Sequence, residues 1–303
     1  MKLNKLMLPM LLVLGCGGVH AQTSIFGSEL GSFGVLGAAA VTSTGATTVA
    51  GNLGVSNNSS ITGVTGIFGS LANDGPGVVS GAIHQGNAFA SLADTQLTMA
   101  MTSLGLMGPG TTLGADLTGL TLAPGVYTVP AGTSNLTGTL TLDGQGNANA
   151  AWVFQMPSTL ITSSGSWVNI TNTGSGAGVF WNVGSSATLG STTSFEGNIL
   201  ASTSITLGSG VTLNCGRALA HTGAVTLNSN TVDAGNCLGT VVAESNGLSH
   251  GLTVNNDGSA PQPLAFSPVT AVPEPETYAL LLVGLGLIGG AVKRRSAALR
   301  LAA

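Results

Sequence analysis

Short apolar runs that recur about every 20 residues constrain the fold of this 303-residue chain more than any other feature. The dipeptides Thr188-Leu189, Thr206-Leu207 and Thr226-Leu227 follow one another at intervals of 18 and 20 residues, and a corner of small residues follows each. Thr159-Leu160 is interpreted as a further copy. Because such a short repeat buries its apolar side chains against the next copy, the pattern predicts a β-solenoid.

The individual strands are indicated by Val, Ile, Leu, Phe, Trp and Thr between turns of Gly, Ser and Asn. We expect strands at residues 139–142, 152–154, 168–170, 179–181, 198–200, 204–207 and 224–227. Asp143-Gly144 is the kind of dipeptide that closes an antiparallel hairpin, so a β-sandwich remains an alternative.

One segment, residues 78–106, predicts a single long helix instead. Its large side chains fall near one face at helical spacing, and glycine and proline at 108–110 end it. We expect the helix to lie along the solenoid with its methionines packed in the core. The residues of the predicted inner face are Phe89, Leu92, Gln96, Met99 and Leu106.

Charge is almost absent from the chain. Only 6% of its residues are charged, against roughly 25% in an ordinary soluble domain. Between residues 22 and 272, Arg217 is the sole basic residue, whereas the same span holds nine acids. A body with one cation cannot neutralise a run of phosphates, which excludes nucleic-acid binding and disfavours attachment to anionic lipid or anionic polysaccharide. The acids are Glu29, Asp74, Asp94, Asp116, Asp143, Glu196, Asp233, Glu244 and Asp257.

The N-terminus is typical of a secretory signal peptide, residues 1–21. Lys2 and Lys5 precede an apolar stretch, and cleavage is expected after Val19-His20-Ala21. A lipoprotein site with lipidation on Cys16 is a competing interpretation.

The C-terminus has three parts in order. Pro273-Glu274-Pro275 precedes an apolar run at 278–292, which Lys293-Arg294-Arg295 closes. This segment, residues 272–296, resembles the PEP-CTERM sorting signal, which an exosortase-type enzyme recognises and removes. The resemblance implies export to the cell surface or extracellular matrix of a Gram-negative bacterium, with transient anchoring in the inner membrane. A plain single-span anchor is the alternative.

Two further segments complete the division of the chain. Residues 22–239 are the expected solenoid domain, and residues 240–271, which are polar with scattered Gly, Asn and Pro, are interpreted as a flexible spacer. Residues 297–303 form a tail.

No pattern in the chain indicates catalysis. The acids are scattered without close pairs, no Gly-x-Ser-x-Gly elbow occurs, and a single cation leaves a lyase without its usual base. His84, His221 and His250 lack metal-ligand spacing. We therefore expect neither an enzyme, nor a metal, nor a cofactor.

Removal of the leader leaves two cysteines, Cys215 and Cys237. An even pair in an exported protein favours a disulfide, and their separation of 22 residues is close to one coil. Two buried thiols are the alternative.

A flat, uncharged face lined by small hydroxylated side chains can order water. Equivalent residues on adjacent rungs lie about 4.8 Å apart, and alternate residues along a strand about 6.6 Å apart, which is close to oxygen spacings in ice. Threonine adds a poorly hydrated methyl group beside its hydroxyl. Threonine also simply suits strands, and composition alone does not separate these interpretations.

Six segments in this order resemble the microbial ice-binding protein family. The resemblance implies a right-handed, three-faced β-solenoid whose first coil is separated in sequence from the rest by a long helix. It implies adsorption to an ice surface. We expect a monomer, with extracellular polysaccharide as a further candidate partner. A structural or adhesive matrix protein without ice affinity is the alternative. The six segments are 33–55, 122–127, 136–146, 151–155, 179–189 and 216–220.

The family places its ice-binding residues on one flat face, often as Thr-Ala/Gly-x-Thr/Asn. Residues 44–47, Thr-Gly-Ala-Thr, match this pattern, and later corners match it loosely. We therefore expect one ice-binding face with moderate thermal hysteresis or mainly inhibition of recrystallisation. Its predicted residues are Thr44, Thr47, Ser164, Ser166, Thr192, Ser194, Thr212 and Thr231.

Overall fold

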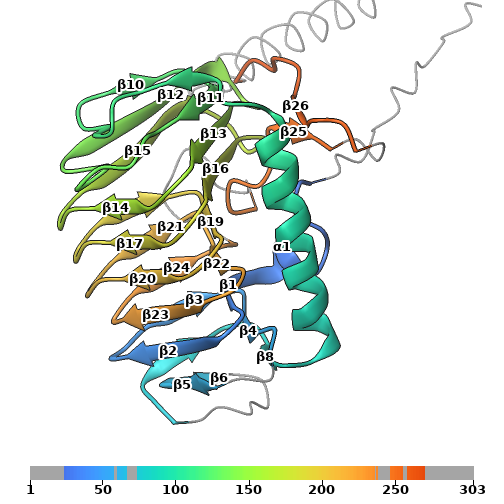
Figure 1. Ribbon diagram of the computed structural model, residues 1–303, viewed down its shortest axis with the longest axis vertical. Helices are drawn as coiled ribbons and strands as arrows, with labels where there is room; N and C mark the ends of the chain where they lie inside the picture. The colour runs from blue at the N-terminus through green and yellow to red at the C-terminus, as the bar shows by residue number, and fades with distance from the viewer. Residues whose placement is uncertain are drawn as a thin grey trace, which may run out of the picture.

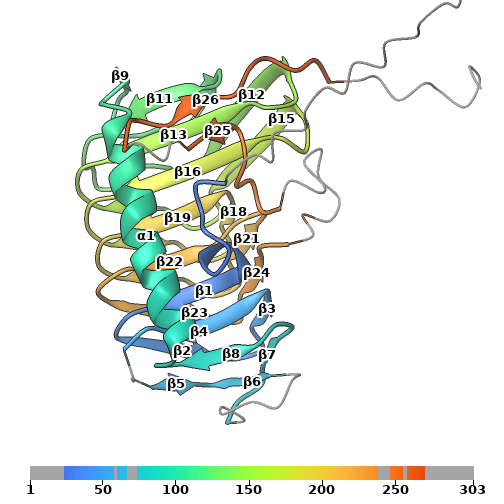
Figure 2. The same cartoon turned by 90° about the vertical axis from the view of Figure 1, so that its right-hand side faces the viewer.

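The computed structural model describes residues 24–57, 60–66, 74–235, 237, 246–254 and 258–269. Within them the chain winds through three parallel β-sheets, which we name A, B and C, and one long helix lies against sheet A (Figure 1; Figure 2). A mainly-β solenoid with a packed helix is therefore confirmed. The predicted signal peptide and the predicted segment 272–296 lie outside the described residues.

Each complete coil contributes one strand to every sheet, in the order A, B, C. In stacking order, sheet A contains β8 (Ile83–Gln85), β4 (Asn52–Val55), β1 (Phe33–Gly37), β22 (Ala218–Ala220), β19 (Asn198–Ala201), β16 (Gly178–Val183), β13 (Ala151–Met156), β11 (Gly125–Thr128) and β9 (Thr111–Thr112). Sheet B contains β14 (Leu160–Thr162), β17 (Ala187–Leu189), β20 (Ile205–Leu207), β23 (Ala224–Asn228), β2 (Ala40–Thr44) and β5 (Ile61–Thr62).

Sheet C contains β10 (Thr121–Leu122), β12 (Thr139–Asn147), β15 (Trp167–Thr173), β18 (Ser194–Glu196), β21 (Thr212–Asn214), β24 (Thr231–Asp233), β3 (Thr48–Ala50), β7 (Gly77–Val79) and β6 (Val64–Gly66). Six of the seven predicted strands lie within these elements, and the seventh, 204–207, begins one residue before β20. Asp143-Gly144 lies inside β12, which pairs with β15 in parallel. The hairpin that favoured a sandwich is therefore absent at this site.

The stack is discontinuous in sequence, as the resemblance implied. Strands β1, β2 and β3 pair with β22, β23 and β24, so the first coil closes onto the last coil of the C-terminal part. Helix α1 (Ala88–Leu106) then carries the chain back along sheet A to the opposite end of the stack, where β9 begins (Figure 2).

Alternation along the strands separates core from surface. In sheets B and C, inward side chains are buried and the next side chain faces outward, as in Ala187, Thr188 and Leu189. Sheet A is buried on both sides because α1 covers its outer face. A second core between α1 and sheet A includes Phe180, Leu200 and Leu219.

The helix begins later than predicted and uses a different face. Residues 77–85 contain β7 and β8, and Asn87 caps the helix by accepting a hydrogen bond from the backbone N–H of Ala90 at 3.0 Å. The predicted inner residues Leu92, Met99 and Leu106 are exposed by 46%, 63% and 54%. The outer side chains of sheet A are bulky, so small residues allow the close approach of the helix. The buried face is Ala90, Ala93, Leu97, Ala100 and Leu104.

A disulfide and a buried arginine hold together the coils that contain β21 to β24. Cys215 and Cys237 form a disulfide that joins the segments following β21 and β24, with Cα atoms 4.7 Å apart, and this confirms the predicted pairing. The short 3-10 helix η1 (Leu30–Ser32) precedes β1. Arg217 is fully buried beside it, and burial lowers the pKa of its guanidinium to about 10. It donates to the carbonyls of Gly31, Asn246 and Gly247 and to Asn198 Oδ1.

Residues in the predicted spacer 240–271 pack against the solenoid where the structure describes them. Leu248 and Leu252 are buried, and Ser249 bridges Gly178 at the edge of sheet A. Strand β25 (Leu252–Thr253) pairs with β26 (Gln262–Pro263). The described parts of this segment therefore contact the solenoid: Leu252 belongs to the core under α1, whereas residues 262–268 are held by backbone pairing with β25 and with Asn147.

In the described part of the chain, α1 is not apolar enough to cross a membrane, and no other helix there is long enough. The predicted apolar run at 278–292 lies outside that part.

Candidate functional site

Sheets B and C are the two sheets of the solenoid that α1 leaves open. Sheet B is drawn in Figure 1 as a column of short parallel rungs on the side away from the helix. Both faces carry outward threonines, so the arrangement of those threonines and of nearby charges decides which face is the better candidate.

A ladder of five threonines runs down the middle of sheet B. The pairing register places one exposed threonine on each of five successive strands, with Ile161 in the equivalent position on β14. Within the described residues none of the five hydroxyls forms a hydrogen bond with the protein, so all remain available to water. We call this set the B ladder: Thr188, Thr206, Thr226, Thr42 and Thr62.

The B ladder crosses the break in the chain order. Thr226 on β23 lies beside Thr42 on β2, although 184 positions (226 minus 42) separate them in sequence. The buried residues on either side of each ladder threonine, such as Val41 and Val225, pack inside the solenoid and hold the strands in register. Threonine suits these positions because its β-branched side chain fits a pleated strand and its hydroxyl faces solvent.

The residues beside the B ladder are small and uncharged. Ala40 pairs with Ala224 on one side, and Thr44 pairs with Asn228 on the other. No strand of sheet B contains Asp, Glu, Lys, Arg or His. The ladder therefore stands on a neutral sheet without bulky side chains beside it in the described rungs.

Two of the predicted ice-binding residues face inward. Thr47 and Ser166 are each only 1% exposed. The Thr47 hydroxyl accepts a hydrogen bond from the backbone N–H of Asn230 at 3.2 Å, and Ser166 donates to the carbonyls of Leu136 and Ser163. Both predictions are wrong, because these side chains fill the corner between sheets B and C.

At Ser166 the local cause is the left-handed residue directly before it, and three other corners share this arrangement, whereas at 44–47 the left-handed Gly45 (φ 71°) precedes the exposed Ala46. Gly165, Thr192, Gly210 and Ser229 have φ of 73°, 57°, 70° and 50°. The next side chain in each case is turned into the corner and buried, as at Ser166. A Thr-x-x-Thr pattern that spans such a corner therefore has its two threonines in different environments.

The remaining predicted residues are divided between two places. Thr44, Ser164 and Thr192 are exposed at or next to the corner between sheets B and C. Three others lie in one ladder on sheet C, which continues to Thr48 on β3. The prediction that all eight share one flat face is wrong. The three sheet C residues are Ser194, Thr212 and Thr231.

Sheet C is neither uniform nor neutral. Its outer ladder includes the exposed side chains of Trp167 and Val78 between the hydroxylated residues. A neighbouring position holds Glu196, whose burial raises its carboxyl pKa to about 7 and whose Oε2 has no hydrogen-bond partner. Asp143 and Asp233 lie on outward positions of the same sheet.

Three members of the B ladder are the threonines of the Thr-Leu repeat in the sequence. Thr188, Thr206 and Thr226 marked the repeat, and the structure confirms that they are in register. Thr159 is not the next copy, because Thr188 pairs with Ile161. The two coils before the helix contribute Thr42 and Thr62, and the register of Thr42 with Thr226 depends on a contact between distant segments.

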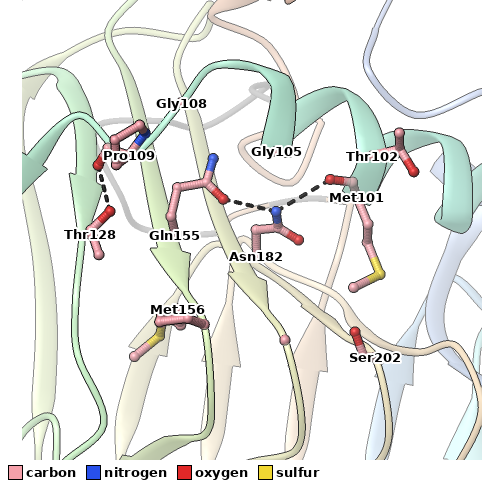
Figure 3. A pocket seen from close by; sticks show the side chains of 12 residues that line it. Met101, Thr102, Gly105, Gly108, Pro109, Thr128, Gln155, Met156, Asn182 and Ser202 are labelled. Carbon is pink, nitrogen blue, oxygen red and sulfur yellow. Dashed lines mark hydrogen bonds between the residues drawn. The ribbon is translucent and has the colours of Figure 1, made fainter.

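A groove of about 610 Å³ lies between the C-terminal end of α1 and the edge of sheet A (Figure 3). Its central amides fasten the helix to the sheet: Asn182 donates to the carbonyl of Met101 and to Gln155 Oε1, and Gln155 donates to the carbonyl of Leu104. These amides therefore serve the packing of the helix. The described residues contain no cluster of three or more His, Cys, Asp or Glu side chains that could hold a metal ion.

Comparison with known proteins agrees with this geometry. The family model described as ice-binding-like matches residues 35–233, and the model of the PEP-CTERM protein-sorting motif matches residues 271–295. An ice-binding protein of Nostoc sp. (strain HG1) is 46% identical over 213 residues, which cover 70% of this chain and 74% of that protein. One from Colwellia sp. is 32% identical, covering 68% and 82%.

Solved structures show the same fold. The crystal structure of an ice-binding protein from the Antarctic ascomycete Antarctomyces psychrotrophicus superposes with a TM-score of 0.62 at 35% identity, covering 71% of this chain and all of that one. An ice-binding protein from an Antarctic biological consortium gives 0.58 at 37% identity, covering 69% and 90%. The fold and the open threonine face thus define a β-solenoid protein of the ice-binding type. The chain belongs to the ice-binding-like family, and its sorting motif marks it as secreted.

Proposed function

We propose that this protein binds ice through the B ladder and thereby limits ice growth or recrystallisation outside the cell. The single observation that carries this assignment is the ladder itself: five exposed threonines in register, with free hydroxyls, on a sheet without charge. Its relatives of known name, described above, are ice-binding proteins, which supports the activity but does not select the face.

The physical argument concerns the water that the ladder holds. Successive threonines lie about 4.8 Å apart, so their hydroxyls form a regular row that bound water can follow. The methyl groups between them offer no hydrogen bonds. Water beside them therefore forms its hydrogen bonds outward, toward an ice lattice. A charged side chain would orient nearby water around itself, and sheet B contains none.

Adsorption through such a face requires no chemical step. We therefore propose a binding protein without enzymatic activity or cofactor. The tail at 271–295 supports recognition by an exosortase-type sorting enzyme, with transient inner-membrane anchoring before release. We propose that the exported form is a monomer, because a neutral face that meets a crystal surface must remain uncovered.

The assignment is tested by two matched substitutions in the same coil. Thr226 lies in the B ladder and Thr231 in the ladder of sheet C, and both are exposed. We expect Thr226→Tyr to raise the concentration needed to inhibit ice recrystallisation at least ten-fold, because the bulky ring holds neighbouring rungs away from ice. Thr231→Tyr is expected to leave it within two-fold of the unmodified protein.

Three outcomes of this assay would be decisive. Equal losses from both variants, or a loss confined to Thr231→Tyr, would reject sheet B as the binding face. A purified protein that neither shapes ice nor inhibits recrystallisation would favour the alternative function, a structural or adhesive protein of the extracellular matrix.

A further inference from the structure

The widest part of sheet C differs from the rest of the solenoid surface. Strands β12 and β15 have nine and seven residues, whereas the other strands of sheet C have two or three. Their outward side chains form three facing pairs. We call this set the C platform: Thr139 with Trp167, Thr141 with Asn169, and Asp143 with Thr171.

Trp167 is the most unusual member of the C platform. Its side chain is 54% exposed, whereas Trp152 and Trp181 are fully buried and donate their indole N–H groups to backbone carbonyls. Within the described residues, Trp167 has neither an aromatic contact nor a hydrogen bond to its side chain. Its neighbours in the ladder are Thr139 and Ser194, so a small hydroxylated residue would fit the strand there. An exposed indole at this position leaves both a ring face and an N–H donor free.

The groups around Trp167 suit a polyhydroxylated ligand. Asn169 lies about 6.6 Å further along the same strand face and provides both a donor and an acceptor. Asp143 lies in the middle of the neighbouring strand β12, about 13 Å along the sheet from Thr139. Hydrogen bonds from Asn172 Nδ2 and the backbone N–H of Gln145 reach only its Oδ1, so Oδ2 is left free. A chain of linked sugar rings can reach all of these groups at once.

The negative charge of this face limits the chemical class of ligand that it can bind. Asp143 and the nearby Asp116, which accepts a hydrogen bond from Thr137, are negative, and the described strands of sheet C contain no basic residue. A polyanion would therefore be repelled. An uncharged saccharide has apolar C–H groups on its ring face that pack against an indole, and hydroxyls that donate to carboxylate and amide oxygens.

We propose that the C platform binds a neutral extracellular polysaccharide, with one sugar ring stacked on Trp167 and hydroxyls of the linked rings bonded to Asn169 and Asp143. The site lies on a different sheet from the B ladder. One molecule can therefore hold matrix polymer on sheet C while sheet B stays open.

The proposal is tested by electrophoresis of the native protein through gels that contain hydroxyethyl cellulose, dextran or alginate. We expect retardation by at least one of the two neutral glucans and none by alginate. Trp167→Thr, which extends the hydroxylated ladder, is expected to raise the apparent dissociation constant at least five-fold, and Asn169→Ala at least two-fold. Thr226→Tyr, on sheet B, should bind the glucan as the unmodified protein does.

Fluorescence gives an independent readout, because Trp167 is the exposed tryptophan of the three. The retarding glucan should protect it from acrylamide quenching, and this protection should be absent in Trp167→Thr. Unchanged ice activity in Trp167→Thr would show that the variant is folded. Unretarded migration in both neutral glucans, retardation by alginate, or equal retardation of Trp167→Thr and the unmodified protein would each overturn the proposal.

Discussion

Sheets B and C are formed by the same coils and both face solvent, yet their surfaces differ in kind. Sheet B presents five successive threonines on strands without charge. The ladder of sheet C is interrupted by Trp167 and Val78, and Glu196 and Asp233 lie beside it. Threonine in register is therefore common to both faces. The two faces differ because the threonine ladder is unbroken and uncharged only on sheet B.

The largest effect is expected from placing a charge in the B ladder. Thr206→Lys adds an ammonium group to the middle rungs, and its hydration shell disrupts the ordered water on either side. We expect more than a ten-fold rise in the concentration that inhibits recrystallisation. Thr212→Lys, in the next sheet of the same coil, is the matched control and should change it less than two-fold.

A smaller but measurable effect concerns stability on sheet C. Burial raises the carboxyl pKa of Glu196 from 4.5 to about 7, so the folded state binds its proton more tightly than the unfolded state does. The stabilisation is fully present below pH 4.5 and is lost as the pH rises to 7, at about 1.4 kcal/mol for each pH unit. Denaturant unfolding at pH 5 and pH 8 should show this loss, and Glu196→Gln should remove it.

Two other carboxyls have lowered pKa values, but they do not affect stability between pH 5 and pH 8. Hydrogen bonds from Thr118 and from the Gln145 backbone lower the pKa values of Asp116 and Asp143, so their contribution is lost only as the pH falls below the ordinary value near 3.8. A Glu196→Gln protein that is still less stable at pH 8 than at pH 5 would contradict the assignment to Glu196.

Substitution of the corner residue Thr47 distinguishes a threonine that stabilises the fold from one that binds ice. Thr47→Val keeps the shape but removes the oxygen that accepts from the backbone N–H of Asn230, leaving a buried donor unpaired. We expect a loss of about 1–3 kcal/mol in the free energy of unfolding. Ice activity of the folded variant should be unchanged. Thr42→Val on the B ladder should show the reverse, with unchanged stability and weaker activity.

These contrasts also show where the sequence stopped being informative. Strand positions, the long helix and the Cys215–Cys237 pair could be predicted, since each depends on local pattern or on cysteine count. The outward face could not, because the corners, each with one residue at positive φ, bury Thr47 and Ser166 while Thr44 and Ser164 of the same corners stay exposed. That conformation is set by hydrogen bonds between coils, such as Gly210 N–H to the carbonyl of Asn228.

The face of the helix was mispredicted for a related reason. Large apolar residues occur on both faces of α1, and periodicity alone does not decide whether Leu92 and Met99 or Leu97 and Leu104 face the core. Sheet A already presents bulky side chains such as Phe180 and Leu200 toward the helix. The helix therefore turns toward the sheet the face that alternates Ala90, Ala93 and Ala100 with Leu97 and Leu104, and a single helix sequence does not contain this information.

The smallest effect is expected from a substitution that lengthens the B ladder. Ile161 occupies the ladder position on β14, beside Thr188, and is partly exposed. Ile161→Thr should give a sixth rung in register and lower the concentration that inhibits recrystallisation by up to two-fold. Thr139→Ser on sheet C alters a hydroxylated residue outside the ladder and should have no effect. If Ile161→Thr weakened activity while the melting temperature stayed the same, the apolar methyl groups at the end of the ladder, rather than the number of hydroxyls, would limit binding.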